Sequence, residues 1–147
     1  MIPPFDQASG NLPRGIHDAT WEELVTRYGT TPRRLRLLAG LKDALDALAA
    51  AGCRRAYIDG SFVTAKEDPA DFDGCWEAAG VNAGLLDPVL LDFSGFRRAQ
   101  KATFGGELFV ARMPADPMGT SFLDFFQRDK YTDEPKGIIA IDLGGLT

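Results

Sequence analysis

The sequence is poor in the residues that build disulfide frameworks and zinc sites. Its 147 residues include two cysteines, Cys53 and Cys75, and one histidine, His17. Two thiols and one imidazole fall short of a four-ligand zinc site and cannot form a disulfide framework, so we expect reduced, buried thiols. Long apolar stretches are also missing. The longest, "LLDPVLLDF", is interrupted by acids, which argues against a membrane span.

Acidic residues outnumber basic ones, 21 to 16. The net charge is −5, which argues against extended, sequence-independent binding of nucleic acid, because that binding depends on many Lys and Arg contacts to phosphate. The first residues show no basic stretch followed by an apolar one, so we expect no secretory signal and a cytoplasmic location. The length favours one domain over 1–147, and the Pro, Gly and Asn of 1–17 predict an extended N-terminal arm.

Two helices are predicted in the first third of the chain. Thr20 and Glu23 have the capping-box spacing, which predicts a short helix ending near Tyr28. A Thr-Pro pair precedes the second, over 33–51, where leucines recur at three- and four-residue steps.

The rest of the chain contains short apolar runs bounded by Gly, Pro or Asp. We predict strands in "RAYID", "FDGCW", "PVLLDF" and "GIIAIDL", a helix over 95–104 and a short helix in "TSFLDFFQRD". The expected fold class is α+β, a small mixed β-sheet with helices packed on it.

The pair Gly60-Ser61 follows the first predicted strand. Backbone N–H groups after a strand, together with a Ser hydroxyl, can hold phosphate oxygens, and Gly permits close approach. Gly-Ser is also a common turn pair, so it decides nothing alone.

Asp71 and Asp73 are one residue apart, so on a strand both point to the same face. Two adjacent carboxylates repel each other unless a cation or proton lies between them, and Mg²⁺ is bound by one or two carboxylates plus phosphates and water. The alternative is a surface turn, since "EDPADFDG" is rich in turn formers. A calcium loop is excluded, because the third acidic position and the closing Glu are missing.

Asp92 is the candidate third acid. It lies between apolar residues in "LLDF", where an ionised carboxylate on a buried strand would need a partner. The alternative is an edge position facing water. Glu107, after "FGG", is interpreted as a turn residue.

The order "IDGSF", "DFD" and "LLDF" resembles the nucleotidyltransferase superfamily related to DNA polymerase β, over about a quarter of the chain. The resemblance implies a nucleotidyltransferase-like fold, with a helix between Ser61 and Asp71. It also implies two Mg²⁺ ions and ATP or another NTP as substrate. Asp71 and Asp73 would bridge the ions, and Asp92 would bind one of them and accept the acceptor's proton. The phosphates would lie at Gly60 and Ser61.

The sequence departs from that pattern at three places. Asp59 stands where an apolar residue is usual, and Gly74 follows Asp73. Phe62 stands where minimal members carry a basic residue, for which Lys66 is the nearest substitute.

Segments near both ends, "GNLPRGIHDATWEEL" and "EPKGIIAIDL", look like those of small uncharacterised bacterial proteins with a nucleotidyltransferase-like domain. Small proteins of this build resemble components of toxin–antitoxin modules, which implies a protein partner as one acceptor. The alternatives are an inactive nucleotidyltransferase-like binding module and a structural protein with a chance motif. The basic residues Arg97, Arg98 and Lys101 either contact phosphate or acceptor or form the wet face of a helix.

Overall fold

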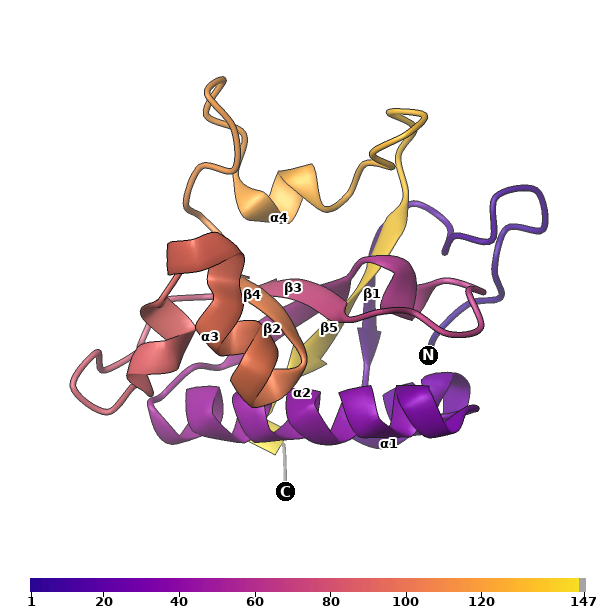
Figure 1. The fold of residues 1–147 in the computed structure, drawn as a ribbon. Helices are drawn as coiled ribbons and strands as arrows, with labels where there is room; N and C mark the ends of the chain where they lie inside the picture. Colours follow the sequence, from indigo (N-terminus) through magenta and orange to yellow (C-terminus); the bar gives the residue numbers. More distant parts are fainter. Residues whose placement is uncertain (146–147) are drawn as a thin grey trace.

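The computed structural model describes residues 1–145 as an α+β fold built on one five-stranded mixed sheet (Figure 1). The sheet order is β1-β5-β2-β3-β4; β1 is parallel to β5 and β3 to β4, whereas β2 is antiparallel to both β5 and β3. The strands are β1 (Gly15–Ala19), β2 (Arg55–Asp59), β3 (Phe72–Trp76), β4 (Gly106–Val110) and β5 (Gly137–Asp142).

Helices α1 (Trp21–Tyr28) and α2 (Pro32–Ala50) begin where their caps predict. The Thr20 hydroxyl accepts a hydrogen bond from the Glu23 amide at 3.1 Å, and the Thr31 hydroxyl accepts one from the Arg34 amide at the same distance. Each cap satisfies an amide that the first helical turn leaves free. Within residues 1–145, no helix has both the length and the apolar character that a membrane span needs.

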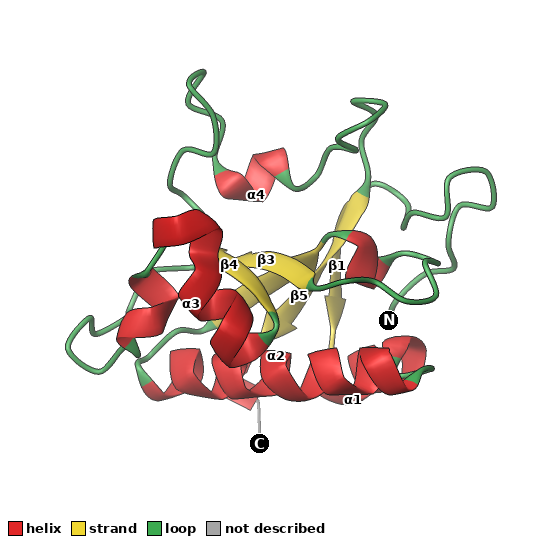
Figure 2. Cartoon of the chain, in the orientation of Figure 1, coloured by secondary structure: helices red, strands yellow, loops and turns green. Residues whose placement is uncertain are grey.

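The two faces of the sheet differ in what covers them. One face packs on α2, and the short helix α4 (Phe122–Phe125) with its long flanking loops lies over the other (Figure 2). Since alternate side chains of a strand point to opposite faces, Phe72 and Trp76 enter the large core under α2, and Cys75 belongs to the smaller cluster under α4. Asp73 shares the α4 face with Cys75.

Two predictions for the middle of the chain were wrong. "PVLLDF" contains no strand: Pro88–Leu91 is a 3₁₀ helix, η2, whose cap is the Asp87 carboxylate accepting from the Val89 amide at 3.0 Å. An Asp cap followed by Pro is a helix start, and it outweighs the β propensity of the apolar run. The helix implied between Ser61 and Asp71 is only the 3₁₀ turn η1 (Ser61–Val63), followed by loop.

Strands β1 and β4 were not predicted. β1 begins inside the predicted arm and carries only one residue of high β propensity, Ile16; it becomes a strand because β5 offers a parallel partner from Gly137 to Ile141. The part of the arm that precedes β1 packs against the domain. Ile2 and Leu12 are buried, and the Gly10 carbonyl accepts from the Ala65 amide at 3.0 Å.

Helix α3 (Ser94–Phe104) covers the predicted 95–104 segment, but its first turn is irregular. Gly95, Phe96 and Arg97 have left-handed backbone angles, with φ of 56°, 57° and 61°. Non-glycine residues rarely adopt this conformation, so the two side chains are held there at a cost.

Candidate metal centre

Three carboxylates lie in register across neighbouring strands of the sheet. In the strand pairing, Asp59 of β2 is opposite Asp73 of β3, and Asp73 is opposite Glu107 of β4. Side chains directly opposite one another on adjacent strands have Cβ atoms about 5 Å apart, and like charges there destabilise a sheet. We call Asp59, Asp73 and Glu107 the acid row.

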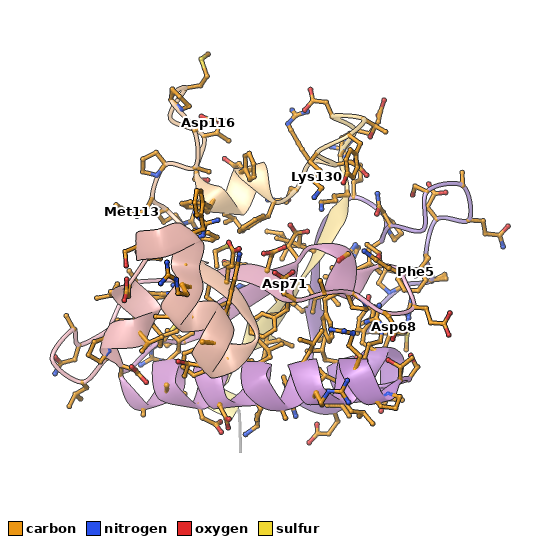
Figure 3. All side chains as sticks on the ribbon, in the orientation of Figure 1. Phe5, Asp68, Asp71, Met113, Asp116 and Lys130 are labelled. Atoms are coloured by element: carbon orange, nitrogen blue, oxygen red, sulfur yellow. The ribbon has the colours of Figure 1, made fainter. Side chains whose placement is uncertain are left out.

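Asp71 lies two residues before Asp73 and extends the acid row into a cluster. Carboxylate oxygens of Asp71, Asp73 and Glu107 all lie within 4.8 Å of one another. Figure 3 shows Asp71 on the α4 side of the sheet, below the loop that carries Lys130. The predicted convergence of Asp71 and Asp73 is therefore present, and Glu107 joins them.

The electrostatics of the cluster are those of carboxylates held together without enough countercharge. Burial first, and then the charges of Asp71, Glu107 and Asp59, together raise the pKa of Asp73 to about 7. Burial and then the charge of Glu107 also raise the pKa of Asp71. Within the part of the chain that the structure describes, neither Asp71 nor Asp73 takes part in a salt bridge.

Cations stand at the two ends of the acid row. At one end the Lys136 ammonium lies 3.1 Å from Asp59 Oδ1, although burial still raises the pKa of Asp59 to about 6. At the other end Glu107 pairs with Arg97 Nε at 3.0 Å and with Lys101 Nζ at 2.9 Å. The middle carboxylate, that of Asp73, is the one left without a paired cation.

This donor set fits a hard divalent cation. All the donors are carboxylate oxygens, which Mg²⁺ and Ca²⁺ prefer, and their mutual repulsion is the kind that a bound cation relieves. Asp71, Asp73 and Glu107 would hold such an ion.

The Arg97 side chain reaches Glu107 from the left-handed turn of α3. Its guanidinium also lies 5.6 Å from the centre of the Phe109 ring, a cation–π contact. A left-handed residue costs roughly 1–2 kcal/mol, so the contacts of Arg97 offset local strain. Strain of this kind concentrates at functional sites.

Gly60 and Ser61 lie beside the acid row, at the end of β2. Gly60 has φ of +80°, and a Cβ atom there would lie 2.6 Å from Asp73 Oδ2. A side chain at position 60 would therefore displace the Asp73 carboxylate. Glycine is required here both for the backbone angle and for access to Asp73.

A buried arginine fixes the loop that follows Ser61. Arg34 of α2 is 3% exposed, and its guanidinium donates to the carbonyls of Phe62 at 2.6 Å, Thr64 at 3.1 Å and Glu67 at 3.3 Å, as well as to that of Lys66. The Arg34 side chain connects α2 to the predicted phosphate loop.

Lys66 lies in that loop with its side chain exposed. Its positive charge opposes the rise in the pKa of Asp71, after the larger effects of Lys101 and Lys130, so all three lysines act on the same carboxylate. The structure thus brings the predicted residues Gly60, Ser61, Lys66, Asp71 and Asp73 to one end of the sheet.

Asp92 is not part of the carboxylate cluster formed by Asp71, Asp73 and Glu107. It follows η2 rather than lying on a strand, and its Oδ1 accepts hydrogen bonds from the Ser94 hydroxyl at 2.6 Å and the Ser94 amide at 3.1 Å. The Ser94 hydroxyl, more than its amide, lowers the pKa of Asp92. Asp92 therefore caps a turn, and the place of a third acid on a following strand is taken by Glu107.

Sequence reasoning missed two members of the acid row, Asp59 and Glu107. Glu107 was interpreted as a turn residue because of the Gly pair before it, although "ELFV" has strand-forming residues after the acid. Asp59 was noted only as a departure from a pattern. Its position at the end of a strand, one residue before Gly60, was the available signal.

Comparison with known proteins places the chain in a family. Residues 3–142 match the family described as "Family of unknown function (DUF6932)", so the protein belongs to that family. Searches of the curated proteins and of the solved structures each found no match.

Proposed function

We propose that this protein is a metal-dependent nucleotidyltransferase that moves a nucleoside monophosphate from ATP or another NTP to a hydroxyl acceptor. The observation that carries the proposal is the convergence of Asp71, Asp73 and Glu107 within 4.8 Å, beside Gly60. The order of these residues along the chain supports it, since Gly-Ser, Asp-x-Asp and a third acid on the next strand is the arrangement of the polymerase β-like superfamily.

The chemistry has a defined balance of bonds. The acceptor oxygen forms a bond to the α-phosphorus, the bond from that phosphorus to the bridging α–β oxygen breaks, and pyrophosphate leaves with the electron pair. The hydroxyl proton passes to a carboxylate of the cluster. Bound Mg²⁺, two ions by the resemblance, would neutralise phosphate charge and lower the pKa of the acceptor hydroxyl.

The protein's own part is positioning and charge. Lys66, Lys101 and Lys130 act on the Asp71 carboxylate and are suited to phosphate oxygens that approach it. Arg34 holds the Gly60–Lys66 loop in one conformation through its hydrogen bonds to backbone carbonyls. Preorganised positioning of this kind supplies most of the catalysis in phosphoryl chemistry.

The direct test uses ATP labelled at the α-phosphate with a cell lysate as the source of acceptor. We expect label on an acceptor with the wild type and none with Asp71→Asn plus Asp73→Asn, while γ-labelled ATP transfers nothing in either case. A matched control, Glu22→Gln plus Asp43→Asn, removes two exposed acids away from the site and keeps the wild-type level. Transfer from the γ label would instead identify a kinase.

The second candidate is a catalytically inactive, nucleotidyltransferase-like module that acts by binding a protein partner, as in a toxin–antitoxin pair. One observation favours it: both oxygens of Glu107 are already paired with Arg97 and Lys101. Calorimetric titration with Mg²⁺ and ATP separates the two candidates. Absence of heat and of thermal stabilisation would support the binding module, whose partner would then be a protein rather than a nucleotide.

A further inference from the structure

A cavity of about 480 Å³ opens on the α4 side of the sheet, near the start of β1. Its volume is in the range of small-molecule sites, 300–1,000 Å³ as a rough guide. The polar side chains that line it come from the N-terminal arm, from α4 and the loops on either side of it, and from the segment before β5: Arg14, Thr120, Asp124, Gln127, Arg128 and Lys136.

The lining favours an anion. Arg14, Arg128 and Lys136 are cations, and Asp124 is the one carboxylate among the lining residues. Lys136 is paired with Asp59, so the two arginines and Asp124 leave an excess of one positive charge at the cavity. Over the described ranges, Arg14 takes part in no salt bridge. The Arg128 guanidinium donates to the Asp133 carbonyl at 3.1 Å and lies 3.7 Å from the exposed Asp133 carboxylate. Two guanidinium groups facing one cavity can bind a phosphate by paired hydrogen bonds.

Lys136 connects this cavity to the acid row. Its side chain is 15% exposed and lines the cavity, and its ammonium lies 3.1 Å from Asp59 Oδ1. Asp59 in turn lies opposite Asp73 in the sheet. Lys136 therefore belongs both to the lining of the cavity and to the ion pair at the Asp59 end of the acid row.

The cations around the acid row thus form two groups on opposite ends. Lys101 and Arg97 stand at the Glu107 end, and Lys136 stands at the Asp59 end, where the cavity opens. In phosphoryl transfer the attacking and leaving oxygens are roughly in line, so the acceptor hydroxyl and the leaving pyrophosphate lie on opposite sides of the α-phosphorus. One cation group at each end of the acid row is suited to binding one anionic substrate at each end.

We infer that the cavity binds the acceptor, and that the acceptor is a small hydroxyl compound carrying a phosphate monoester. This inference rests on the proposed function and assigns the triphosphate of the nucleotide to the side of the cluster where Lys66, Lys101 and Lys130 act on Asp71. Arg14 and Arg128 hold the phosphate of the acceptor, and its hydroxyl is directed past Lys136 toward the acid row.

The test is a titration of ¹⁵N-labelled protein with ribose 5-phosphate, followed by NMR. We expect saturable shifts of the Gly15, Gln127 and Lys136 amides and of the Arg14 and Arg128 Nε–H signals. Arg14→Ala plus Arg128→Ala weakens the affinity by about tenfold or more, because charge-assisted contacts are lost. Arg33→Ala plus Arg36→Ala, a matched loss of two exposed arginines of α2, leaves it unchanged.

Two further measurements show whether the nucleotide or the acceptor occupies the cavity, and whether this inference or the proposed function fails. With Mg²⁺ and a non-hydrolysable ATP analogue present, ribose 5-phosphate still binds the cavity. If the analogue competes with it, the cavity binds the nucleotide and the inference is wrong. Equal weakening by the α2 control would also overturn it, since binding would then be unspecific. Failure of Mg²⁺ to bind, with the cavity shifts intact, would refute the nucleotidyltransferase and leave a phosphate-ester site.

Discussion

Asp73→Asn tests the electrostatics of the acid row directly, because it removes one charge and keeps the side chain's shape. Burial and three neighbouring acids raise the pKa of Asp73 from 3.8 to about 7. The folded protein therefore binds this proton more tightly than the unfolded chain does, and the wild type loses stability as pH rises from about 4 to about 7. The variant cannot lose that stability, since its amide does not ionise.

The magnitude follows from the size of the shift. A difference of about 3 pKa units corresponds to roughly 4 kcal/mol at pH 8, at about 1.4 kcal/mol per unit. This is an upper bound, because the residue is partly solvated and local relaxation reduces the repulsion. We expect Asp73→Asn to be more stable than the wild type by about 2–4 kcal/mol at pH 8, a rise in Tm on the order of 10 °C for a domain of this size. The gain shrinks steadily toward pH 4.

Urea unfolding followed by tryptophan fluorescence at pH 4, 5.5 and 8 measures the effect. Asp43→Asn, which neutralises an exposed acid of α2, is the control and shows little change at any of the three values. Adding Mg²⁺ at pH 8 stabilises the wild type but not Asp73→Asn, since a ligand that binds only the folded state adds to its stability. A variant less stable than the wild type at pH 8, or a difference independent of pH, would refute the account of the acid row.

Three other substitutions test the remaining parts of the site. Gly60→Ala lowers the affinity for Mg²⁺ by about tenfold or more in calorimetry, because the added Cβ would lie 2.6 Å from the Asp73 carboxylate. The control Gly119→Ala, where φ is +84° and the space around the residue is open, adds only backbone strain and leaves the Mg²⁺ affinity unchanged. Arg34→Met destabilises the protein by on the order of 3 kcal/mol in urea unfolding, since it leaves several loop carbonyls unpaired; equal stability would show that the loop does not depend on it. Glu107→Gln weakens Mg²⁺ binding while Asp92→Asn leaves it intact, and the reverse result would restore Asp92 as the third ligand.

Local rules in the sequence determined those parts of the fold that depend on neighbouring residues. The caps at Thr20 and Thr31 determine where α1 and α2 start. The alternation in "FDGCW" puts the Asp73 and Phe72 side chains on different faces of the sheet. Each of these depends on residues within one turn of helix or one strand. The α+β class followed from them.

The errors concern residues whose structure is decided by distant partners. β1 exists because β5 pairs with it, and β4 because β3 pairs with it, so the sequence of either strand alone is too weak a signal. Glu107 could not be recognised as a member of the acid row without the register between β3 and β4. Asp92 was chosen instead because it was the nearest acid in an apolar run, and its hydrogen bonds to Ser94 became visible only in the structure.

The acid row lowers the stability of the folded protein, and this loss favours a role in binding a cation. A sheet that needed only stability would place apolar or oppositely charged residues opposite one another at this end. Here burial raises the pKa of both Asp59 and Asp73, the neighbouring acids add to the rise at Asp73, and Asp73 has no paired cation among the described residues. The left-handed turn at Arg97 adds a second local cost beside the same carboxylates. A binding module that uses another surface would gain nothing from either cost, whereas a cation centre needs uncompensated carboxylates. The stability difference between the wild type and Asp73→Asn therefore measures how much the fold gives up to keep this centre.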